Sequence, residues 1–168
     1  MTLREATPDD LEAIMAIERR SFPTDAWSSE AMALELASPH GRYLVDEHDG
    51  SIIGYGGVRA LQGSGDADIQ TIAFDAAYRG AGRGRALLRA LLDAAVERGA
   101  REVFLEVRAD NPGAEGLYRS EGFDEIARRP RYYQPDDIDA IVMRLALQHP
   151  RSDHRDESAP DAAKEATA

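Results

Sequence analysis

The stretch Arg79-Gly80-Ala81-Gly82-Arg83-Gly84 decides how this sequence folds. It lies between a predicted strand, Asp68–Phe74, and the strongest predicted helix, Arg85–Arg98. Closely spaced glycines let backbone N–H groups converge on an anion because no Cβ obstructs the approach. The following helix adds the positive end of its dipole. The stretch therefore predicts a strand–loop–helix unit that binds a pyrophosphate, to which Arg79, Arg83 and Arg85 add positive charge.

Three alternative interpretations of this loop compete with that one. A Walker A loop ends in Gly-Lys-Ser or Gly-Lys-Thr, and the sequence has no such ending. A dinucleotide-binding fingerprint needs the spacing G-x-G-x-x-G, whereas the glycines here stand at positions 80, 82 and 84. Glu102 and Glu106 do follow at about 20 residues, as a ribose-binding acid would, but a second parallel βαβ half is missing. The third alternative, a glycine-rich turn without a ligand, stays open on the loop alone.

The regions on either side of the loop alternate between helix and strand patterns. Besides the helix after the loop, which ends at Gly99, helices are predicted from Thr7-Pro8 to about Arg20, from Ser28 to Leu36, and at Pro112–Ser120. Strands are predicted at Thr2–Glu5, Arg42–Asp46, Ile52–Ala60, Asp68–Phe74, Glu102–Val107, Phe123–Ala127 and Ala140–Leu147. This order predicts an α/β (α+β) fold, with a mixed central sheet of about six to seven strands flanked by about four helices.

Length and hydropathy limit the class of protein. The 168 residues suit one domain with one sizeable core, which we place at residues 1–148. Residues 149–168 carry no large apolar side chain, so we expect a disordered acidic and polar tail there. No apolar run approaches the roughly 18–20 residues that span a membrane. The polar N-terminus lacks the apolar region of a signal peptide, so we expect a cytoplasmic protein.

Charge and residue usage exclude several kinds of partner. The formal net charge is −11, which argues against nonspecific binding to nucleic acid, because such binding requires a basic surface. The acidic surface either keeps the protein soluble or attracts a basic substrate. The absence of cysteine excludes disulfides, thiolate metal sites and a cysteine nucleophile. The four histidines show no metal-ligand spacing, so no metal is predicted. Nothing in the sequence indicates an oligomeric state.

Two motifs resemble one known family. The run Arg79-x-x-Gly82-x-Gly84 resembles the acetyl-CoA pyrophosphate loop of the GCN5-related N-acetyltransferases, the GNAT family, whose pattern is Q/R-x-x-G-x-G/A. The stretch from Leu105 to Phe123 is similar to the family pattern L-x-V-x-x-x-N-x-x-A-x-x-L-Y-x-x-x-G-F. The resemblance implies the GNAT fold and acetyl-CoA as cosubstrate. It also implies the cofactor-binding residues Ile72, Ala73 and Phe74 for the pantetheine arm, Arg79, Gly80, Ala81, Gly82, Arg83 and Gly84 for the pyrophosphate, and Asn111 as a further contact.

A subgroup of the family resembles the chain more closely. Leu105-Glu106-Val107-Arg108, before the asparagine, is similar to the bacterial ribosomal-protein alanine N-acetyltransferases, the RimI group. The segments Phe22–Ser28, Arg128–Tyr133 and Asp139–Met143 support this likeness. The Arg128–Tyr133 segment has one residue more than the group's pattern, and we expect it to form a loop at the substrate. The resemblance implies that the acceptor is a protein N-terminal α-amine, such as that of a ribosomal small-subunit protein.

Glu106 is the candidate general base. An acceptor α-amine has a pKa near 8, so only about a tenth of it is neutral at pH 7. A base that acts directly or through one water contributes roughly 10²–10⁴-fold. From the residues alone, an exposed strand face or an ion pair with Arg108 explains a carboxylate in this apolar strand. The family resemblance implies the role of base.

Tyr118 is the candidate acid that protonates the coenzyme A thiolate. A tyrosine on a short helix is more often a core anchor, and only the family pattern implies the acid. Asn111 before Pro112 is explained by N-capping alone. Aromatic side chains suit partly buried recognition surfaces, although plain packing explains them equally well. The candidates for the acceptor groove are Trp27, Tyr132 and Tyr133.

The sequence therefore predicts an acetyl-CoA-dependent N-acetyltransferase that acts on a protein N-terminus. A GNAT enzyme for a small-molecule amine or a lysine side chain is the first alternative. A non-catalytic acyl-CoA-binding module is the second, because fold analogy alone does not establish catalysis.

Overall fold

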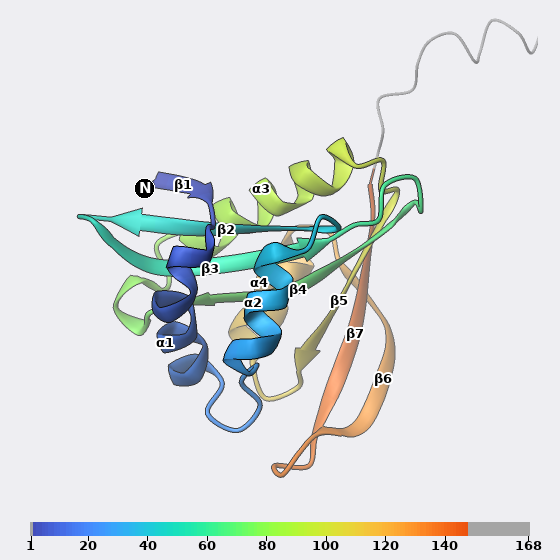
Figure 1. Cartoon of the computed structure of the whole chain (residues 1–168). Helices are drawn as coiled ribbons and strands as arrows, with labels where there is room; N and C mark the ends of the chain where they lie inside the picture. The colour runs from blue at the N-terminus through green and yellow to red at the C-terminus, as the bar shows by residue number, and fades with distance from the viewer. Residues whose placement is uncertain (1, 148–168) are drawn as a thin grey trace, which may run out of the picture.

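The computed structural model describes residues 2–147, shown in Figure 1. Its strands are β1 (Thr2–Glu5), β2 (Gly41–His48), β3 (Ser51–Arg59), β4 (Asp66–Phe74), β5 (Glu102–Arg108), β6 (Asp124–Tyr133) and β7 (Ile138–Ala146). Its α-helices are α1 (Leu11–Ser21), α2 (Ser29–Ala37), α3 (Arg83–Glu97) and α4 (Pro112–Ser120). Short 3₁₀ turns lie at Pro8–Asp10 and Ala76–Tyr78. The predicted α/β fold is confirmed, while the predicted tail at 149–168 lies outside the described residues.

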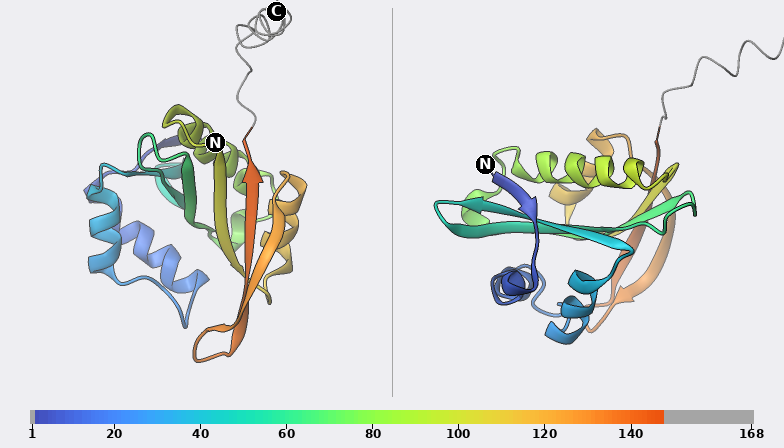
Figure 2. Two further views of the ribbon diagram at one scale, coloured as in Figure 1. Left: turned by 90° about the vertical axis from the view of Figure 1, so that its right-hand side faces the viewer. Right: turned by 45° about the horizontal axis from the view of Figure 1, so that its top comes forward.

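The helices cover both faces of one sheet, with α3 on one side and α1 and α2 on the other (Figure 2). The larger core joins the sheet to α3, through Leu87, Leu88 and Leu91, and to α4. The smaller core joins it to α1 and α2. Successive residues of a strand face opposite sides, so Leu44 of β2 packs into the larger core and Val45 into the smaller one.

The sheet has the strand order β1-β2-β3-β4-β5-β7-β6, and only β4 and β5 are parallel. These two strands pair over three residues of each, from Asp66 to Asp68 and from Glu102 to Phe104. The register of β4 with β3 shifts next to this point, so that Gln70 is an extra residue between Ile69 and Thr71. Beyond Asp68 the two strands separate, as the left view of Figure 2 shows. This gap brings the end of β4 and the end of β5 to a common opening.

The structure differs from the prediction mainly at β6. We expected this strand to end at Ala127 and a loop to follow, but β6 continues to Tyr133 and forms a hairpin with β7. Every residue of β6 before Tyr133 is exposed, because β6 is the edge strand. An edge strand of this kind lacks the apolar alternation by which strands are recognised. The first helix also differs, since Pro8–Asp10 forms a 3₁₀ turn before α1 begins.

Two classes of feature are missing within residues 2–147. No helix there is long and apolar enough to cross a membrane. No group of three or more histidine, aspartate or glutamate side chains there is arranged to hold a metal ion.

Candidate active site

The glycine loop has the backbone geometry of an anion site. Gly80 and Gly82 have φ angles of +79° and +81°, in the left-handed region that favours glycine. A Cβ added at either position would have no atom within 4 Å, so the space beside both glycines is open. Gly82 is also the N-cap of α3, so the free N–H groups of the first helical turn lie directly after the loop. These features fit a pyrophosphate group.

The arginines of the loop are already engaged within the protein. Arg83 donates from Nη1 to Asp46 Oδ2 at 2.9 Å, and Asp46 is fully buried. Arg85 pairs with Glu121, and Arg79 donates from Nε to the Phe74 carbonyl at 3.0 Å. Pairing of Arg83 is required because an unpaired buried carboxylate is costly. Because Arg83 is paired with Asp46, it has little positive charge left to offer a bound anion. The backbone of the glycine loop is therefore the main anion-binding element.

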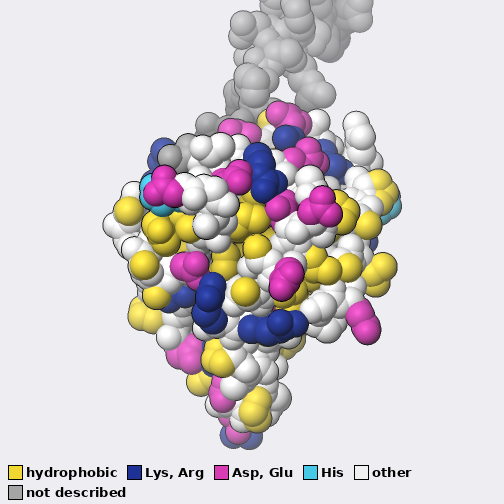
Figure 3. Space-filling model, turned by 60° about the vertical axis from the view of Figure 1, so that its left-hand side comes forward, with side chains coloured by type: hydrophobic (Ala, Val, Ile, Leu, Met, Phe, Trp, Pro, Cys, Tyr) yellow, Lys and Arg dark blue, Asp and Glu magenta, His cyan; other side chains and the backbone are white. Residues whose placement is uncertain are grey.

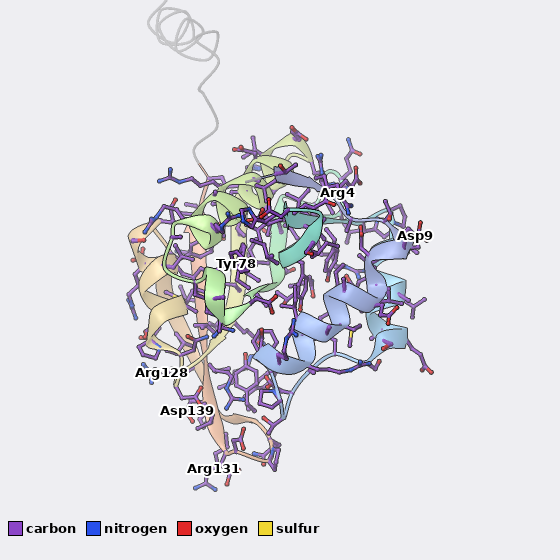
Figure 4. The ribbon with its side chains drawn as sticks, turned by 90° about the vertical axis from the view of Figure 1, so that its left-hand side faces the viewer. Arg4, Asp9, Tyr78, Arg128, Arg131 and Asp139 are labelled. Atoms are coloured by element: carbon purple, nitrogen blue, oxygen red, sulfur yellow. The ribbon has the colours of Figure 1, made fainter. Side chains whose placement is uncertain are left out.

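A cavity of about 520 Å³ opens beside this loop. Figure 4 looks onto this side of the molecule, where the segment that carries Tyr78 lies between α1 and α4. Figure 3 shows the side at another angle: hydrophobic side chains gather in its middle and charged side chains surround them. The predicted cofactor residues that line the cavity are Ile72, Ala73, Phe74, Arg79, Gly80, Gly82, Gly84 and Asn111. Ala81 and Arg83 do not line it, so their contact with the cofactor stays a prediction.

A second cavity, of about 470 Å³, lies where β4 and β5 separate. It brings together the predicted residues Glu106, Tyr118, Trp27, Tyr132 and Tyr133, and it shares Ile72, Asn111 and Tyr118 with the first cavity. A neighbouring groove extends it past Asp68 and Arg129. The residues predicted for cofactor binding, catalysis and acceptor binding therefore line two cavities that share part of their walls.

Tyr118 stands between the two cavities. Its side chain is buried, and its ring packs edge-on against Phe123 with 5.9 Å between the ring centres. Burial raises the pKa of the Tyr118 hydroxyl to about 12. No residue within 2–147 hydrogen-bonds this hydroxyl. Tyr118 is thus a core anchor, as one interpretation held, and it also lines both cavities; its role as proton donor stays a prediction.

Glu106 lies in the second cavity and forms an ion pair with Arg129, from Oε1 to Nε at 3.1 Å. The alternative expectation of an ion pair with Arg108 is wrong. Arg108 instead contacts Asp25, Asp110 and Asp136. The side chain of Glu106 is 29% exposed, so solvent and a substrate can both reach it. The second cavity is thus lined by both an accessible carboxylate, Glu106, and a buried phenol, Tyr118.

The N-cap interpretation of Asn111 holds as well. Its side-chain oxygen accepts a hydrogen bond from the Ala114 N–H at 3.2 Å at the start of α4. Asn111 also lines both cavities. Capping therefore accounts for its position, and a cofactor contact remains an additional prediction.

Glu18 is a site residue that the sequence analysis missed. It is 1% exposed, lines the second cavity and accepts the Trp27 N–H at 3.1 Å, whereas Oε2 has no hydrogen-bond partner in the described chain. Burial raises the pKa of Glu18 to about 7, against the lowering effect of the Trp27 N–H. The available signal was a glutamate at helical spacing from Leu11, Ile14 and Met15, on the apolar stripe of α1.

Similar proteins identify the family of this site. The model of the "Acetyltransferase (GNAT) family" matches residues 11–123. The N-alpha-acetyltransferase RimI of Mycobacterium tuberculosis is 41% identical over 147 residues, which cover 86% of this chain and 91% of that protein. The ribosomal protein bS18-alanine N-acetyltransferase of Escherichia coli is 33% identical over 150 residues, which cover 87% of this chain and 97% of that protein.

A solved structure agrees with these sequences. The crystal structure of the ribosomal-protein-S18-alanine N-acetyltransferase from Escherichia coli matches with a TM-score of 0.80 and 31% identity, and the match covers 90% of this chain and 97% of that one. The resemblance stated from the motifs is confirmed by these matches. The chain belongs to the GNAT family and is an acetyl-CoA-dependent N-acetyltransferase.

Proposed function

We propose that this enzyme acetylates the α-amine of a protein N-terminus, and that an N-terminal alanine of a ribosomal small-subunit protein is its acceptor. One observation carries the proposal: Glu106 and Tyr118 line the same cavity at the separation of β4 and β5. The names of two relatives support this acceptor, since one is an N-alpha-acetyltransferase and the other acts on alanine of ribosomal protein bS18.

Acetyl-CoA fits the cavity beside the glycine loop. The left-handed glycines and the start of α3 suit its pyrophosphate. Within residues 2–147, the edge of β4 at Ile72, Ala73 and Phe74 has no strand partner on the β5 side, which suits the amides of the pantetheine arm. When bound, acetyl-CoA supplies an acetyl group activated as a thioester.

Glu106 acts in this proposal as the general base. At pH 7 most of an α-amine carries a proton and cannot attack a carbonyl. Glu106 accepts that proton, directly or through one water, and a base so placed contributes roughly 10²–10⁴-fold. The acceptor ammonium also replaces Arg129 as the cation beside the carboxylate. The carboxylate of Glu106 is therefore accessible to the acceptor.

Tyr118 acts as the donor to the leaving sulfur. With a pKa of about 12 its hydroxyl stays protonated throughout the physiological range. A thiol in water has a pKa of about 8.5, so proton transfer from this phenol to a thiolate in water is uphill. Apolar burial raises the pKa of a thiol as well. In a cavity without water, the difference between the pKa of the thiol and that of the Tyr118 hydroxyl is therefore smaller. As the N–C bond forms and the C–S bond breaks, Tyr118 hydrogen-bonds the sulfur and supplies its proton. The Tyr118 oxygen takes back the second proton that the acceptor nitrogen loses when the amide forms.

Release of coenzyme A with short peptides tests the proposal. The panel carries different free N-terminal residues, each beside an N-blocked copy. We expect turnover with a peptide that begins with alanine and none with its blocked copy. Turnover on small amines with none on any peptide would reject the protein acceptor, and turnover on blocked peptides that contain lysine would assign the enzyme to side-chain amines.

A further inference from the structure

Three separate segments of the chain meet on the side chain of Arg108, at the end of β5. Its guanidinium donates from Nε and Nη2 to the two carboxylate oxygens of Asp110, at 2.9 and 3.0 Å. Nη2 also donates to Asp136 Oδ2 at 3.2 Å, and Nη1 donates to Asp25 Oδ1 at 3.4 Å. The guanidinium carbon lies 5.2 Å from the centre of the Tyr133 ring. One side chain thus contacts the loop before α2, the loop after β5 and the β6–β7 hairpin.

A hydrogen bond that joins two of these segments directly completes this arrangement. Thr24 Oγ1 donates to Asp136 Oδ2 at 2.7 Å, across 112 positions of sequence. The loop between α1 and α2 is therefore joined to the β6–β7 hairpin both directly and through Arg108. We call this set of residues the Arg108 clasp; its members are Thr24, Asp25, Arg108, Asp110 and Asp136.

The clasp is less exposed and more highly connected than an ordinary surface ion pair. An isolated exposed pair contributes little, because solvent screens it and two long side chains lose freedom. The Arg108 side chain, however, is only 16% exposed, and its fork binds Asp110 through two parallel bonds. The pKa of Asp136 is held below its usual range by hydrogen bonds from Thr24 and Arg108. The clasp is therefore a connected network around one planar cation.

Three members of the clasp border the second cavity, which we call the acceptor cavity because the acceptor is proposed to bind there. Thr24, Asp25 and Arg108 line it, together with Tyr133, Trp27 and Glu106. Arg108 is two positions from Glu106 on β5, so both side chains leave the same face of the strand. Strand β5 therefore sets the position of Glu106 relative to Arg108, the side chain that contacts the Tyr133 ring.

We propose that Arg108 is a positioning residue for the acceptor: it fixes Tyr133 and the Trp27 loop relative to Glu106, without taking part in proton transfer. The inference rests on the acceptor role proposed above for this cavity. It predicts that loss of the clasp weakens acceptor binding and leaves acetyl-CoA binding intact, because the clasp does not reach the glycine loop.

The first test does not depend on turnover. Trp27 is the single tryptophan of the chain, so its fluorescence reports on the loop between α1 and α2. Arg108→Gln and Asp136→Ala are expected to make Trp27 more accessible to acrylamide quenching. Asp124→Ala is the matched control, because it removes a carboxylate of the same hairpin outside the clasp. Equal quenching in all four proteins, the parent included, would overturn the inference.

The second test separates the two substrates. Arg108→Gln and Asp136→Ala are expected to raise the acceptor KM by about tenfold, since small misplacements at a positioned site cost one to two orders of magnitude. The KM for acetyl-CoA should stay unchanged. Arg108→Lys should recover little, because an ammonium cannot reproduce the fork to Asp110. Asp136 lies on an exposed hairpin, so its variant keeps the test valid even if Arg108→Gln fails to fold.

The two proposals can fail separately. No turnover of the parent enzyme on any peptide, with Trp27 still responding to the variants, rejects the protein acceptor and keeps the clasp as a structural device. Normal turnover on peptides with an unchanged acceptor KM in both variants rejects the positioning role. A parallel rise in both KM values rejects it too, because it would mean general loss of structure.

Discussion

The side proposed to bind acetyl-CoA, called the acetyl-CoA side, and the side proposed to bind the acceptor, called the acceptor side, are built in different ways. The first depends on backbone: Gly80 and Gly82 in the left-handed region, the start of α3 and an unpaired edge of β4. The second depends on side chains from α1, the loop after it, β5 and the β6–β7 hairpin, which contact one another across the chain. The difference teaches that single side-chain changes should matter most on the acceptor side, and backbone changes most on the other.

The largest effect is expected where the two sides meet. Glu106→Gln should lower kcat by about 10²–10⁴-fold, because a neutral amide cannot accept the proton. Tyr118→Phe should also lower kcat while leaving the acceptor KM nearly unchanged. Steady-state release of coenzyme A measures both. Glu102→Gln is the control, since Glu102 lies on the same strand and outside both cavities. Near-normal kcat in Glu106→Gln would contradict the assignment and direct attention to Glu18.

The next effect concerns the free energy of unfolding. It tests how much a charged, buried Glu18 destabilises the acceptor side. Burial raises the pKa of Glu18 from its ordinary value of 4.5 to about 7. Between these values the folded protein holds a proton that the unfolded chain releases, so stability falls as pH rises through this window. Glu18→Gln removes this cost and keeps an acceptor for the Trp27 N–H. We expect a gain of at most about 3 kcal/mol at pH 8 and under about 1 kcal/mol at pH 5.

Urea unfolding at both pH values measures this gain. Glu12→Gln is the matched control, because Glu12 is an exposed glutamate of the same helix. A gain that is equal at pH 5 and pH 8 would show that burial of charge is not its cause.

A smaller effect is expected from the backbone of the other side. Gly82→Ala should raise the KM for acetyl-CoA by about tenfold, because a left-handed conformation costs an ordinary residue roughly 1–2 kcal/mol. The acceptor KM should not change. Gly116→Ala is the control, since Gly116 is helical, lines neither cavity and would place an added Cβ with no atom within 4 Å. Equal effects of the two substitutions would show that left-handed geometry is not what the loop requires.

The smallest effect is expected at the exposed ion pair of the base. Arg129 and the acceptor ammonium compete for Glu106, so Arg129→Gln should lower the acceptor KM by about two- to threefold, in line with the modest strength of exposed pairs. Initial rates at varied peptide concentration measure it. Arg128→Gln is the control, because Arg128 pairs with Glu125 instead. A higher acceptor KM in Arg129→Gln would assign Arg129 to binding.

The sequence predicted the backbone geometry of the glycine loop better than the side-chain contacts of the second cavity, because the first is local and the second is not. A glycine at positive φ and a helix start are local, so the motif from Arg79 to Gly84 contains them. Contacts such as Thr24 with Asp136 depend on how distant segments meet, and no local pattern encodes them. The partner of Glu106 was mistaken on this account: Arg108 is its neighbour in sequence, but Arg129 is its neighbour in space. Glu18 was overlooked because its burial follows from tertiary packing.

The early separation of β4 from β5 leaves two strand edges inside a sheet, and such edges are open to pairing with another chain. A bound pantetheine arm would cover one of them, so the cosubstrate would protect the enzyme from self-association. Amide hydrogens between Ile69 and Phe74 should then exchange more slowly with coenzyme A present than without it. The protein should also be more soluble during purification when coenzyme A is present. Heat-induced aggregation should begin at a higher temperature when coenzyme A is in excess.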